Sequence, residues 1–418
     1  MLTVRDLKNL SGKTVVVRVD FNVPHKGEVI SDDNRIRAAI PTISELLKGG
    51  ARVVLLSHLG KVEWKKLRKG QKTQEDIDGQ IKKNDLSIAV APLKAHLEAA
   101  LGKEVSVSFS KATRGEELKA AAKALKDGSV LLVQNTRYEE GEEKNDAELA
   151  KEWASLADAY VMDAFGSAHR AHASTYGIPA ALKEEGKPVA VGFLVEKEVK
   201  NLSRCVEVKD EDRPYVAILG GLKVSDKIQV IDTLLKKCDY IVIGGAMAYT
   251  FRKALGEEIG SSFLDESALE YAKKCLEEAN GRIILPVDSV ITDSFEPVEG
   301  RKVELADGSI KEGFEGVDIG PKSEKLFKDV IAKAKMVFWN GPMGVFEQAE
   351  FQQGTKAVCE AIRDLKGKAF TVCGGGDSAS AVKQFGYTAD FSHVSTGGGA
   401  SLEMIQNDGH LPGIDVLK

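Results

Sequence analysis

The sequence contains little cysteine, and its cysteines are scattered. Cys205, Cys238, Cys275, Cys359 and Cys373 are odd in number and form no Cys-x-x-Cys pair. Disulfide frameworks and structural zinc sites need cysteines at close, paired spacing, so neither is expected. We therefore predict buried thiols.

Long apolar runs are also missing. No uninterrupted apolar stretch reaches the roughly 18 residues that a membrane-spanning helix needs. The N-terminal segment carries Arg5, Asp6 and Lys8 where a signal peptide requires apolar residues, so export is not expected. We predict a cytoplasmic protein with no membrane partner.

An excess of positive charge is absent as well. The chain has 58 Lys and Arg against 63 Asp and Glu, a net charge of −5, so no overall basic field would hold a nucleic acid. Common nucleotide-binding motifs are lacking: Gly-x-x-x-x-Gly-Lys-Ser/Thr, Gly-x-Gly-x-x-Gly, and the kinase-type His-Arg-Asp and Asp-Phe-Gly. Any nucleotide would have to be held in another way.

The chain does contain short apolar runs that alternate with helical stretches. The runs lie at 14–19, 52–56, 129–133 and 159–161 in the first half, and at 215–219, 240–243, 282–285, 336–339 and 369–372 in the second. Continuous apolar strands between helices are typical of parallel sheets covered on both faces. A length of 418 residues allows about two to three domains. We predict an α/β protein with two Rossmann-like parallel-sheet domains.

The boundary between these domains is predicted near Pro188. Just beyond it, apolar residues 195, 199, 202 and 206 form one stripe on a charged helix that could join the two halves. Another helix is expected to begin after Asp33 and Asn34, which are good N-cap residues, and to stop at Gly49-Gly50. Residues 61–83, rich in Lys, Gln, Glu and Asp, are predicted to form a solvated surface excursion.

Glycines of the second half collect directly after the predicted strands. The clusters lie at 220–221, 244–245, 341–344, 374–376 and 397–399. One such cluster is more often only a tight turn. Parallel sheets, however, bind ligands beyond the carboxyl ends of their strands, where glycine lets backbone N–H groups approach phosphate. The repetition therefore predicts a phosphate or nucleotide site.

Three charged residues near these glycines have two interpretations each. Asp377 follows the triple glycine and suits either a Mg²⁺ ligand or a plain helix N-cap. Lys223 and Lys227 lie one turn apart if their segment is helical, and would either bind phosphate or stay solvated. The residues alone leave these alternatives open.

The first half places cations after several strands. Arg35, His58, Arg137, His169 and Arg170 all lie at or near predicted strand ends. A lone histidine there is more often structural, but the convergence of several cationic groups predicts a pocket for a small, multiply charged acid.

Seven motifs, taken together, resemble the phosphoglycerate kinase family along nearly the whole chain. They are RVDFNVP (18–24), SHLG (57–60), DAFGSAHRAHAS (163–174), ILGGLKVSDKI (218–228), WNGPMGVFE (339–347), GGGDS (374–378) and STGGGAS (395–401). The resemblance implies a substrate domain, 1–187, that binds 3-phosphoglycerate or 1,3-bisphosphoglycerate. It also implies a nucleotide domain, 188–404, that begins with the interdomain helix and binds Mg-ADP or Mg-ATP. A C-terminal tail, 405–418, would cross back to the first domain.

The resemblance also implies roles for individual residues. Substrate-binding positions would be Asp20, Asn22, Arg35, His58, Lys61, Arg137 and Arg170. Nucleotide-binding positions would be Gly221, Lys227, Gly245, Gly320, Asn340, Pro342, Glu347, Gly375, Gly376, Asp377 and Ser378, with Asp377 also at the metal. Arg35, Lys223, Gly376 and Gly399 would stabilise the transferring phosphoryl group, with Gly375 and Gly398 presenting further backbone donors.

The implied function is that of a glycolytic phosphotransferase: reversible phosphoryl transfer from 1,3-bisphosphoglycerate to ADP with Mg²⁺, in a monomer that closes by hinge bending around the helix at 195–206. The acceptor of the reverse reaction is a carboxylate, already ionised at pH 7, so no general base is needed. The family often has Arg where this chain has Lys61, and residues 61–83 are longer than usual. The alternatives are an NAD-dependent oxidoreductase of doubly wound fold and a non-catalytic nucleotide-binding protein.

Overall fold

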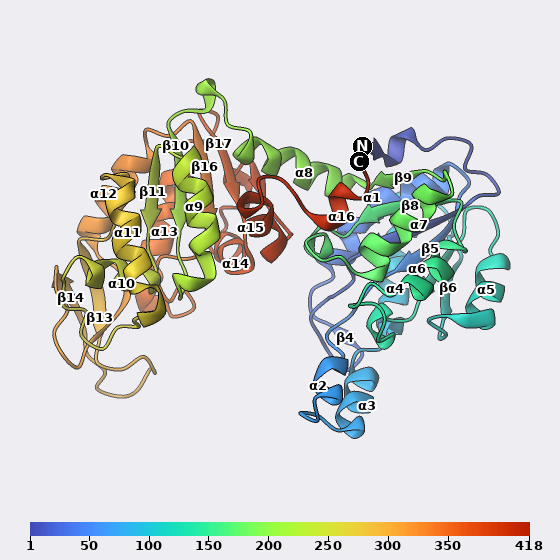
Figure 1. Ribbon diagram of the computed structural model, residues 1–418, viewed down its shortest axis with the longest axis horizontal. Coiled ribbons are helices and arrows are strands. Elements are labelled where there is room, and N and C mark those ends of the chain that lie inside the picture. Colours follow the sequence, from blue (N-terminus) through green and yellow to red (C-terminus); the bar gives the residue numbers. More distant parts are fainter. The chain divides into compact units, whose positions relative to one another are not determined.

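The computed structural model describes residues 1–418, which divide along the chain into two compact units (Figure 1). Unit 1 comprises Met1–Val199 and His410–Lys418, and unit 2 comprises Lys200–Gly409. The first division falls within helix α8 (Phe193–Val206), beyond the position near Pro188 taken from the sequence. The final segment of unit 1 begins at His410, where the sequence suggested 405.

Unit 1 is built on a seven-stranded parallel sheet with the order β1-β9-β8-β2-β5-β7-β6. Its strands are β1 (Leu2–Thr3), β2 (Thr14–Val19), β5 (Arg52–Leu56), β6 (Val107–Ser110), β7 (Val130–Val133), β8 (Ala159–Asp163) and β9 (Val189–Val191), with a separate hairpin of β3 (His25–Lys26) and β4 (Val29–Ile30). Its helices are α1 (Asn34–Lys48), α2 (Trp64–Arg68), α3 (Gln74–Lys83), α4 (Val90–Leu101), α5 (Gly115–Lys123), α6 (Ala147–Ala154), α7 (Ile178–Glu184) and α16 (Pro412–Asp415).

Helix α1 confirms the expected apolar period but not its expected cap. Ile36, Ile43 and Leu47 are buried against the sheet, and the helix ends before Gly49. Asp33 occupies the N-cap position, but its carboxylate accepts no hydrogen bond from a backbone N–H of the helix. That carboxylate instead accepts hydrogen bonds from Arg37 at 2.7 Å and from the His96 ring at 2.6 Å.

The segment predicted as a surface excursion is mostly exposed, but it is folded. It forms α2 and α3, a helical hairpin in which Ile77 is buried and Thr73 caps α3 by accepting from the Asp76 N–H. The prediction therefore missed two helices. Their strongly polar composition conceals a single buried apolar residue and a good capping box.

Unit 2 contains a six-stranded parallel sheet with the order β12-β11-β10-β16-β17-β18 and a three-stranded antiparallel sheet with the order β14-β13-β15. Its strands are β10 (Tyr215–Leu219), β11 (Tyr240–Ile243), β12 (Ile283–Ile284), β13 (Asp288–Thr292), β14 (Val303–Asp307), β15 (Glu315–Ile319), β16 (Met336–Asn340), β17 (Phe370–Cys373) and β18 (His393–Val394). Its helices are α9 (Ile228–Lys237), α10 (Met247–Ala254), α11 (Leu269–Ala279), α12 (Pro321–Ile331), α13 (Gln353–Arg363), α14 (Gly376–Gln384) and α15 (Gly399–Gln406).

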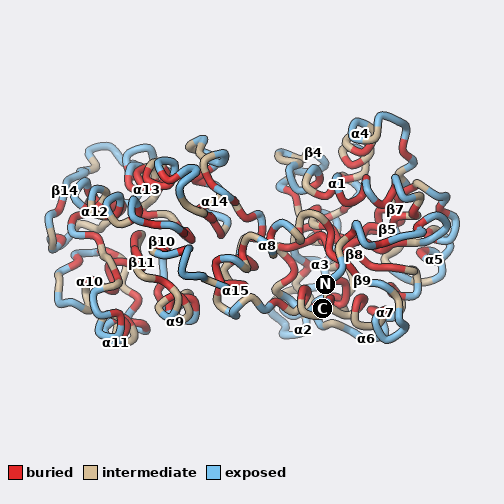
Figure 2. The backbone as a smooth tube through the Cα atoms, turned by 90° about the horizontal axis from the view of Figure 1, so that it is seen from above, coloured by how far each residue is buried: buried red, intermediate tan, exposed pale blue.

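The central strands of both units are buried on both faces, as their continuous apolar sequences predicted (Figure 2). All five cysteines are free and buried, which confirms the expected thiols. None of the helices combines the length and the apolar character that crossing a membrane requires. The two α/β units confirm the predicted fold class, while the antiparallel sheet was not predicted.

Candidate active site

Polar residues of unit 1 meet at the carboxyl ends of neighbouring parallel strands. Val19 of β2 pairs with Asp163 of β8, and Arg18 pairs with Leu56 of β5. The loops that follow these strands therefore begin at the same edge of the sheet. They carry Asp20, His58 and Arg170, three of the predicted substrate-binding residues.

Asp20 fixes Arg35 across this edge. The guanidinium of Arg35, at the start of α1, donates to the Asp20 carboxylate. Burial acts to raise the pKa of Asp20, but the positive charges of Arg35 and Arg18 and a hydrogen bond from the Asn22 N–H outweigh it and hold that pKa below its ordinary value. Asp20 therefore stays ionised at neutral pH and orients Arg35, whose side chain remains 43% exposed and open to a ligand.

His58 is held neutral and in one tautomer. Burial, with the charges of Arg18 and Arg137, keeps the pKa of its ring well below the usual value, against the opposite influence of Asp20. Its Nδ1 lies 3.1 Å from an Arg18 guanidinium nitrogen. Arginine only donates, so Nδ1 accepts and the proton resides on Nε2. The ring thus keeps one N–H donor for an anion.

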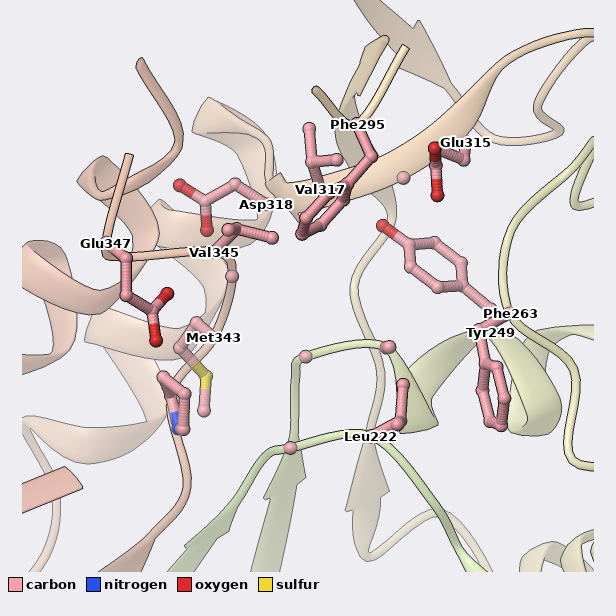
Figure 3. A pocket seen from close by; sticks show the side chains of 16 residues that line it. Leu222, Tyr249, Phe263, Phe295, Glu315, Val317, Asp318, Met343, Val345 and Glu347 are labelled. Carbon is pink, nitrogen blue, oxygen red and sulfur yellow. The ribbon is translucent and has the colours of Figure 1, made fainter. Parts of the chain in front are cut away.

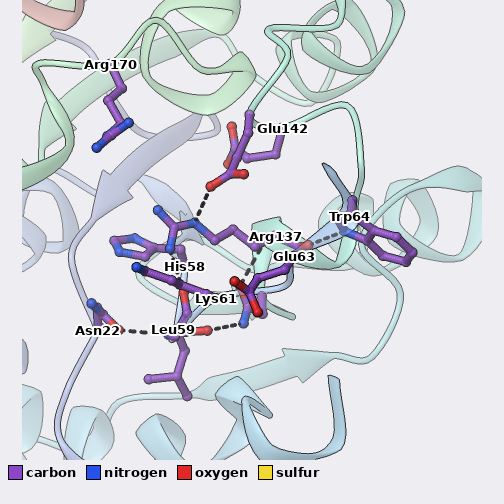
Figure 4. A network of polar contacts seen from close by, with 12 residues as sticks. Asn22, His58, Leu59, Lys61, Glu63, Trp64, Arg137, Glu142 and Arg170 are labelled. Carbon is purple, nitrogen blue, oxygen red and sulfur yellow. Dashed lines mark hydrogen bonds and ion pairs between the residues drawn. The ribbon is translucent and has the colours of Figure 1, made fainter. Parts of the chain in front are cut away.

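Arg137 and Asn22 are linked through Gly60. The Gly60 N–H donates to Asn22 Oδ1 at 2.8 Å, and Arg137 donates to the Gly60 carbonyl at 2.6 Å. Figure 4 shows Asn22, His58, Lys61, Arg137 and Arg170 together around this point. His169 accepts from Arg170 Nε at 3.1 Å, so it supports Arg170. The structure brings the predicted cations of unit 1 into one cluster.

In unit 2 the glycine loops also begin side by side. Leu219 of β10 pairs with both Ile243 of β11 and Asn340 of β16, and Trp339 pairs with Cys373 of β17. A cavity of about 280 Å³ lies beside these strand ends. Gly221, Gly245, Pro342 and Glu347 line it, as do residues of β15 and α10 (Figure 3).

Two of these glycines cannot carry a side chain. Gly245 has φ +67°, and a Cβ there would lie 2.6 Å from the Gly221 nitrogen and 2.9 Å from the Pro342 carbonyl oxygen. Gly375 has φ +97°, and a Cβ would lie 2.4 Å from Asn340 Nδ2. The Gly245 backbone is therefore in close contact with the backbones of two adjacent loops, and Gly375 packs against the Asn340 side chain. The N–H groups of both glycines are already paired, Gly245 with the Met343 carbonyl at 3.0 Å and Gly375 with Ser401 Oγ at 3.1 Å.

A polar network joins the neighbouring loops. Lys227 donates to the Asn340 side chain, which in turn donates to the Gly374 carbonyl at 2.8 Å. Ser378 donates to the same carbonyl at 2.6 Å and accepts from the Gly341 N–H. Burial lowers the pKa of Lys227 to about 8, although Asp377 acts to raise it. This lysine is mostly protonated at neutral pH and lies close to Asp377.

The structure excludes one of the two interpretations of Asp377, that of a plain helix N-cap. Helix α14 begins at Gly376 with Gly375 at the N-cap position and no side-chain cap. Asp377 lies in the first turn with an exposed carboxylate, so it is not the helix N-cap. Gly376 and Gly399 are the first residues of α14 and α15, where backbone N–H groups are unpaired and favour anions.

Lys223 and Gly320 lie apart from this network. Lys223 and Lys227 do not share one turn of an α-helix, because α9 begins only at Ile228, after a short 3-10 turn. Lys223 is exposed, and its charge acts on Asp265. Gly320 is buried against Asp288 before α12 and does not line the cavity.

Two residues that position the sites were not singled out from the sequence. Arg18 is 1% exposed and donates to Ser174 at 2.7 Å, which ties β2 to the loop carrying Arg170. Asp318 lines the cavity and accepts from the Gly354 N–H at 2.7 Å. Burial raises its pKa to about 8, so it remains largely uncharged near neutral pH. For Arg18 the available signal was a charged residue inside the largely apolar strand β2, whereas β15, with the sequence EGVDI, gave no such signal for Asp318.

Comparisons with known proteins agree along the full chain. The sequence model described as "Phosphoglycerate kinase" matches residues 4–408. The phosphoglycerate kinase of Latilactobacillus sakei is 47% identical over 99% of this chain and 98% of its own length, and that of Streptococcus thermophilus is 50% identical over 100% and 98%. The solved phosphoglycerate kinase structure from Coxiella burnetii has a TM-score of 0.82 and 36% identity over 100% of this chain and 98% of that chain. That from Pyrococcus horikoshii OT3 has a TM-score of 0.79 and 30% identity over the same shares.

These matches settle the family. All four relatives named above are kinases, so the alternative of an NAD-dependent oxidoreductase has no support. The motif-based resemblance is confirmed, and the chain belongs to the phosphoglycerate kinase family.

Proposed function

We propose that this chain catalyses reversible phosphoryl transfer from 1,3-bisphosphoglycerate to ADP, giving 3-phosphoglycerate and ATP. The observation that carries this proposal is its full-length membership of the phosphoglycerate kinase family, with a cation cluster in unit 1 and glycine loops in unit 2. The proposed setting is the cytoplasm, and the proposed state is a monomer.

The cation cluster of unit 1 is the proposed binding site for the phosphoglycerate. Arg137 and Arg170 would bind its charged groups, with Lys61 as an additional point charge and Asn22 as a polar contact. Neutral His58 would donate from Nε2. Arg35, held by the Asp20 carboxylate, would be directed at the carboxyl end where the phosphoryl group is exchanged.

The glycine loops of unit 2 are the proposed nucleotide site. Gly221, Gly245 and Pro342 would contact the nucleoside in the cavity, and the Glu347 carboxylate, which faces that cavity, would accept from hydroxyl groups (Figure 3). The loop residues beyond it would bind the phosphates: Lys227, Asn340, Gly375, Gly376, Asp377 and Ser378. Gly320, buried against Asp288, would act by shaping the start of α12.

The residues present fit a Mg²⁺ ion bound together with the nucleotide. Asp377 offers an exposed carboxylate that caps no helix, in the first turn of α14. Mg²⁺ prefers few protein carboxylates plus phosphate and water oxygens, which suits a single aspartate. When bound, the ion supplies neutralisation of phosphate charge.

The protein's part in the reaction is positioning and charge stabilisation. In the ATP-consuming direction the carboxylate oxygen of 3-phosphoglycerate attacks the γ-phosphorus and the bond to the ADP oxygen breaks, so no proton needs to be removed. Arg35, Lys223 and the N–H groups of Gly376 and Gly399 would stabilise the transferring group. Transfer between ligands held by different units requires closure, for which α8 is the proposed hinge, and closure excludes water.

A coupled assay tests the proposal. The protein is incubated with 3-phosphoglycerate and Mg-ATP, and the 1,3-bisphosphoglycerate formed is reduced by a dehydrogenase that oxidises NADH. We expect NADH oxidation that depends on both substrates. No turnover by the wild-type protein would contradict the proposed function.

A further inference from the structure

The α2–α3 hairpin, residues 61–85, contacts the segment that carries Arg137. Trp64, the first residue of α2, donates its indole Nε1–H to the backbone carbonyl of Arg137 at 2.9 Å (Figure 4). Tyr138 donates its hydroxyl to the Ile81 carbonyl in α3. Arg68 of α2 forms an ion pair with Glu140. All three contacts reach residues 137–140, so they join the hairpin to the short stretch of chain that begins with Arg137.

Hydrogen bonds hold the backbone of Arg137 at both its N–H and its carbonyl group. Its N–H donates to Asn135 Oδ1 at 3.0 Å, and its carbonyl accepts from Trp64. Its guanidinium then reaches the Gly60 carbonyl at 2.6 Å and lies 3.4 Å from a Glu143 carboxylate oxygen. The Arg137 side chain is only 16% exposed, so its direction depends on where its backbone is fixed.

Asn84, near the end of the hairpin, holds the backbone of Lys61, a second proposed substrate-binding cation. Asn84 donates from its side chain to the Lys61 carbonyl at 3.0 Å, while its own carbonyl accepts from Asn135. A Cβ at Gly60 would lie 2.2 Å from Asn84 Oδ1, so the loop before Lys61 packs directly on this residue. The two ends of the hairpin therefore meet the backbones of two proposed substrate-binding cations.

We propose that Trp64 is a positioning residue for phosphoglycerate binding, because its indole fixes the Arg137 backbone and so directs the guanidinium toward the substrate. This inference rests on the proposed function. It gives the hairpin, whose outer surface is polar and largely charged, a role in the substrate site that its composition alone does not indicate.

The test replaces the indole with a ring that cannot donate. Trp64→Phe keeps most of the packing and removes only the hydrogen bond to Arg137. Trp153→Phe is the matched control: its indole, in the same unit, donates to the Thr113 carbonyl at 2.8 Å and not to the segment that carries Arg137. Binding of 3-phosphoglycerate is measured by calorimetry, and KM for each substrate by the coupled assay.

We expect Trp64→Phe to raise both the Kd and the KM for 3-phosphoglycerate about three- to ten-fold, the range for one lost hydrogen bond, and to leave the KM for Mg-ATP unchanged. Trp153→Phe should lower the melting temperature without changing either constant. Tyr138→Phe, which removes the second hydrogen bond to the hairpin, should shift the 3-phosphoglycerate constants in the same direction.

Two results would overturn the inference. If Trp64→Phe binds 3-phosphoglycerate as tightly as wild type, or if it raises the KM of both substrates alike, Trp64 only anchors the hairpin. If the wild-type protein itself fails to bind 3-phosphoglycerate, the proposed function falls and this inference falls with it. If the wild-type protein binds 3-phosphoglycerate and Trp64→Phe binds it equally well, only the inference about Trp64 is overturned and the proposed function stands.

Discussion

Substitution of Gly245 by alanine tests the nucleotide site most sharply. The Cβ that this change adds would lie 2.6 Å from the Gly221 nitrogen, 2.8 Å from the Gly221 oxygen and 2.9 Å from the Pro342 oxygen. All three atoms belong to backbone, so no flexible side chain can move aside. The loops after β10 and β16 must move away from the Gly245 loop by several tenths of an ångström, which takes Gly221 and Pro342 out of position.

Gly245→Ala has two separable effects, strain in the backbone of residue 245 and displacement of the neighbouring loops. Alanine at φ +67° costs about 1–2 kcal/mol of stability in any setting. Gly256→Ala isolates that cost, because Gly256 has φ +89° after α10 but no atom within 4 Å of its added Cβ. The displacement of the nucleotide loops is additional in Gly245→Ala. Misplacement on this scale is expected to weaken Mg-ADP binding about 10- to 100-fold.

Calorimetric titrations with Mg-ADP and with 3-phosphoglycerate, together with urea unfolding, provide the assay. Gly245→Ala should lose Mg-ADP affinity and keep its 3-phosphoglycerate affinity. Gly256→Ala should lose about 1 kcal/mol of stability and keep both affinities. A folded Gly245→Ala protein that binds Mg-ADP as tightly as wild type would refute the assignment of these loops to the nucleotide.

Three further predictions concern single side chains. Arg35→Ala should lower kcat about 10³-fold, because a cation aimed at the transferring group is lost. Its control is Arg37→Ala, which breaks only the ion pair between an exposed guanidinium and Asp33 and should keep kcat within about two-fold of wild type. Steady-state kinetics that show equal losses in kcat for both variants would contradict this prediction. Burial raises the pKa of Asp163 to about 7, so the folded state keeps a proton on this carboxyl at pH values where the unfolded state releases it. The contribution of Asp163 to the free energy of unfolding therefore falls as pH rises from about 4 to 7, by up to about 1.4 kcal/mol per pH unit. Asp163→Asn should remove that slope, and urea unfolding between pH 5 and 8 that gives a constant difference from wild type would disprove it. Asp377→Ala should weaken binding of Mg-ADP but not of metal-free ADP, measured by calorimetry with and without EDTA, and equal weakening of both would exclude a metal role.

The parallel sheets could be predicted because their strands carry their own signal. β2, β5, β10 and β11 begin and end where the apolar runs do, since strands covered on both faces are continuously apolar. The antiparallel sheet of β13, β14 and β15 could not be found this way. Its edge strand β14 exposes Val303 and Leu305, so it shows no inward and outward alternation to detect.

The site was predictable where it depends on glycine and charge at strand ends, and not where it depends on partners distant in the sequence. Local sequence suggests that Asp33 caps α1, but His96 and Arg37 bind its carboxylate instead. Lys223 and Lys227 have helical spacing, yet the chain starts its helix later. The neutral state of His58 arises from burial beside Arg18, which no local pattern reveals.

The central claim is that the γ-phosphoryl group of ATP passes to the carboxylate of 3-phosphoglycerate on this protein. The most direct measurement uses ATP labelled in its γ-phosphate and traps the product with hydroxylamine, which converts an acyl phosphate to a hydroxamate and releases its labelled phosphate as inorganic phosphate. We expect labelled acyl phosphate that forms only with 3-phosphoglycerate present, and little label in inorganic phosphate before trapping. Label that appears as inorganic phosphate without 3-phosphoglycerate, or no acyl phosphate at all, would contradict it.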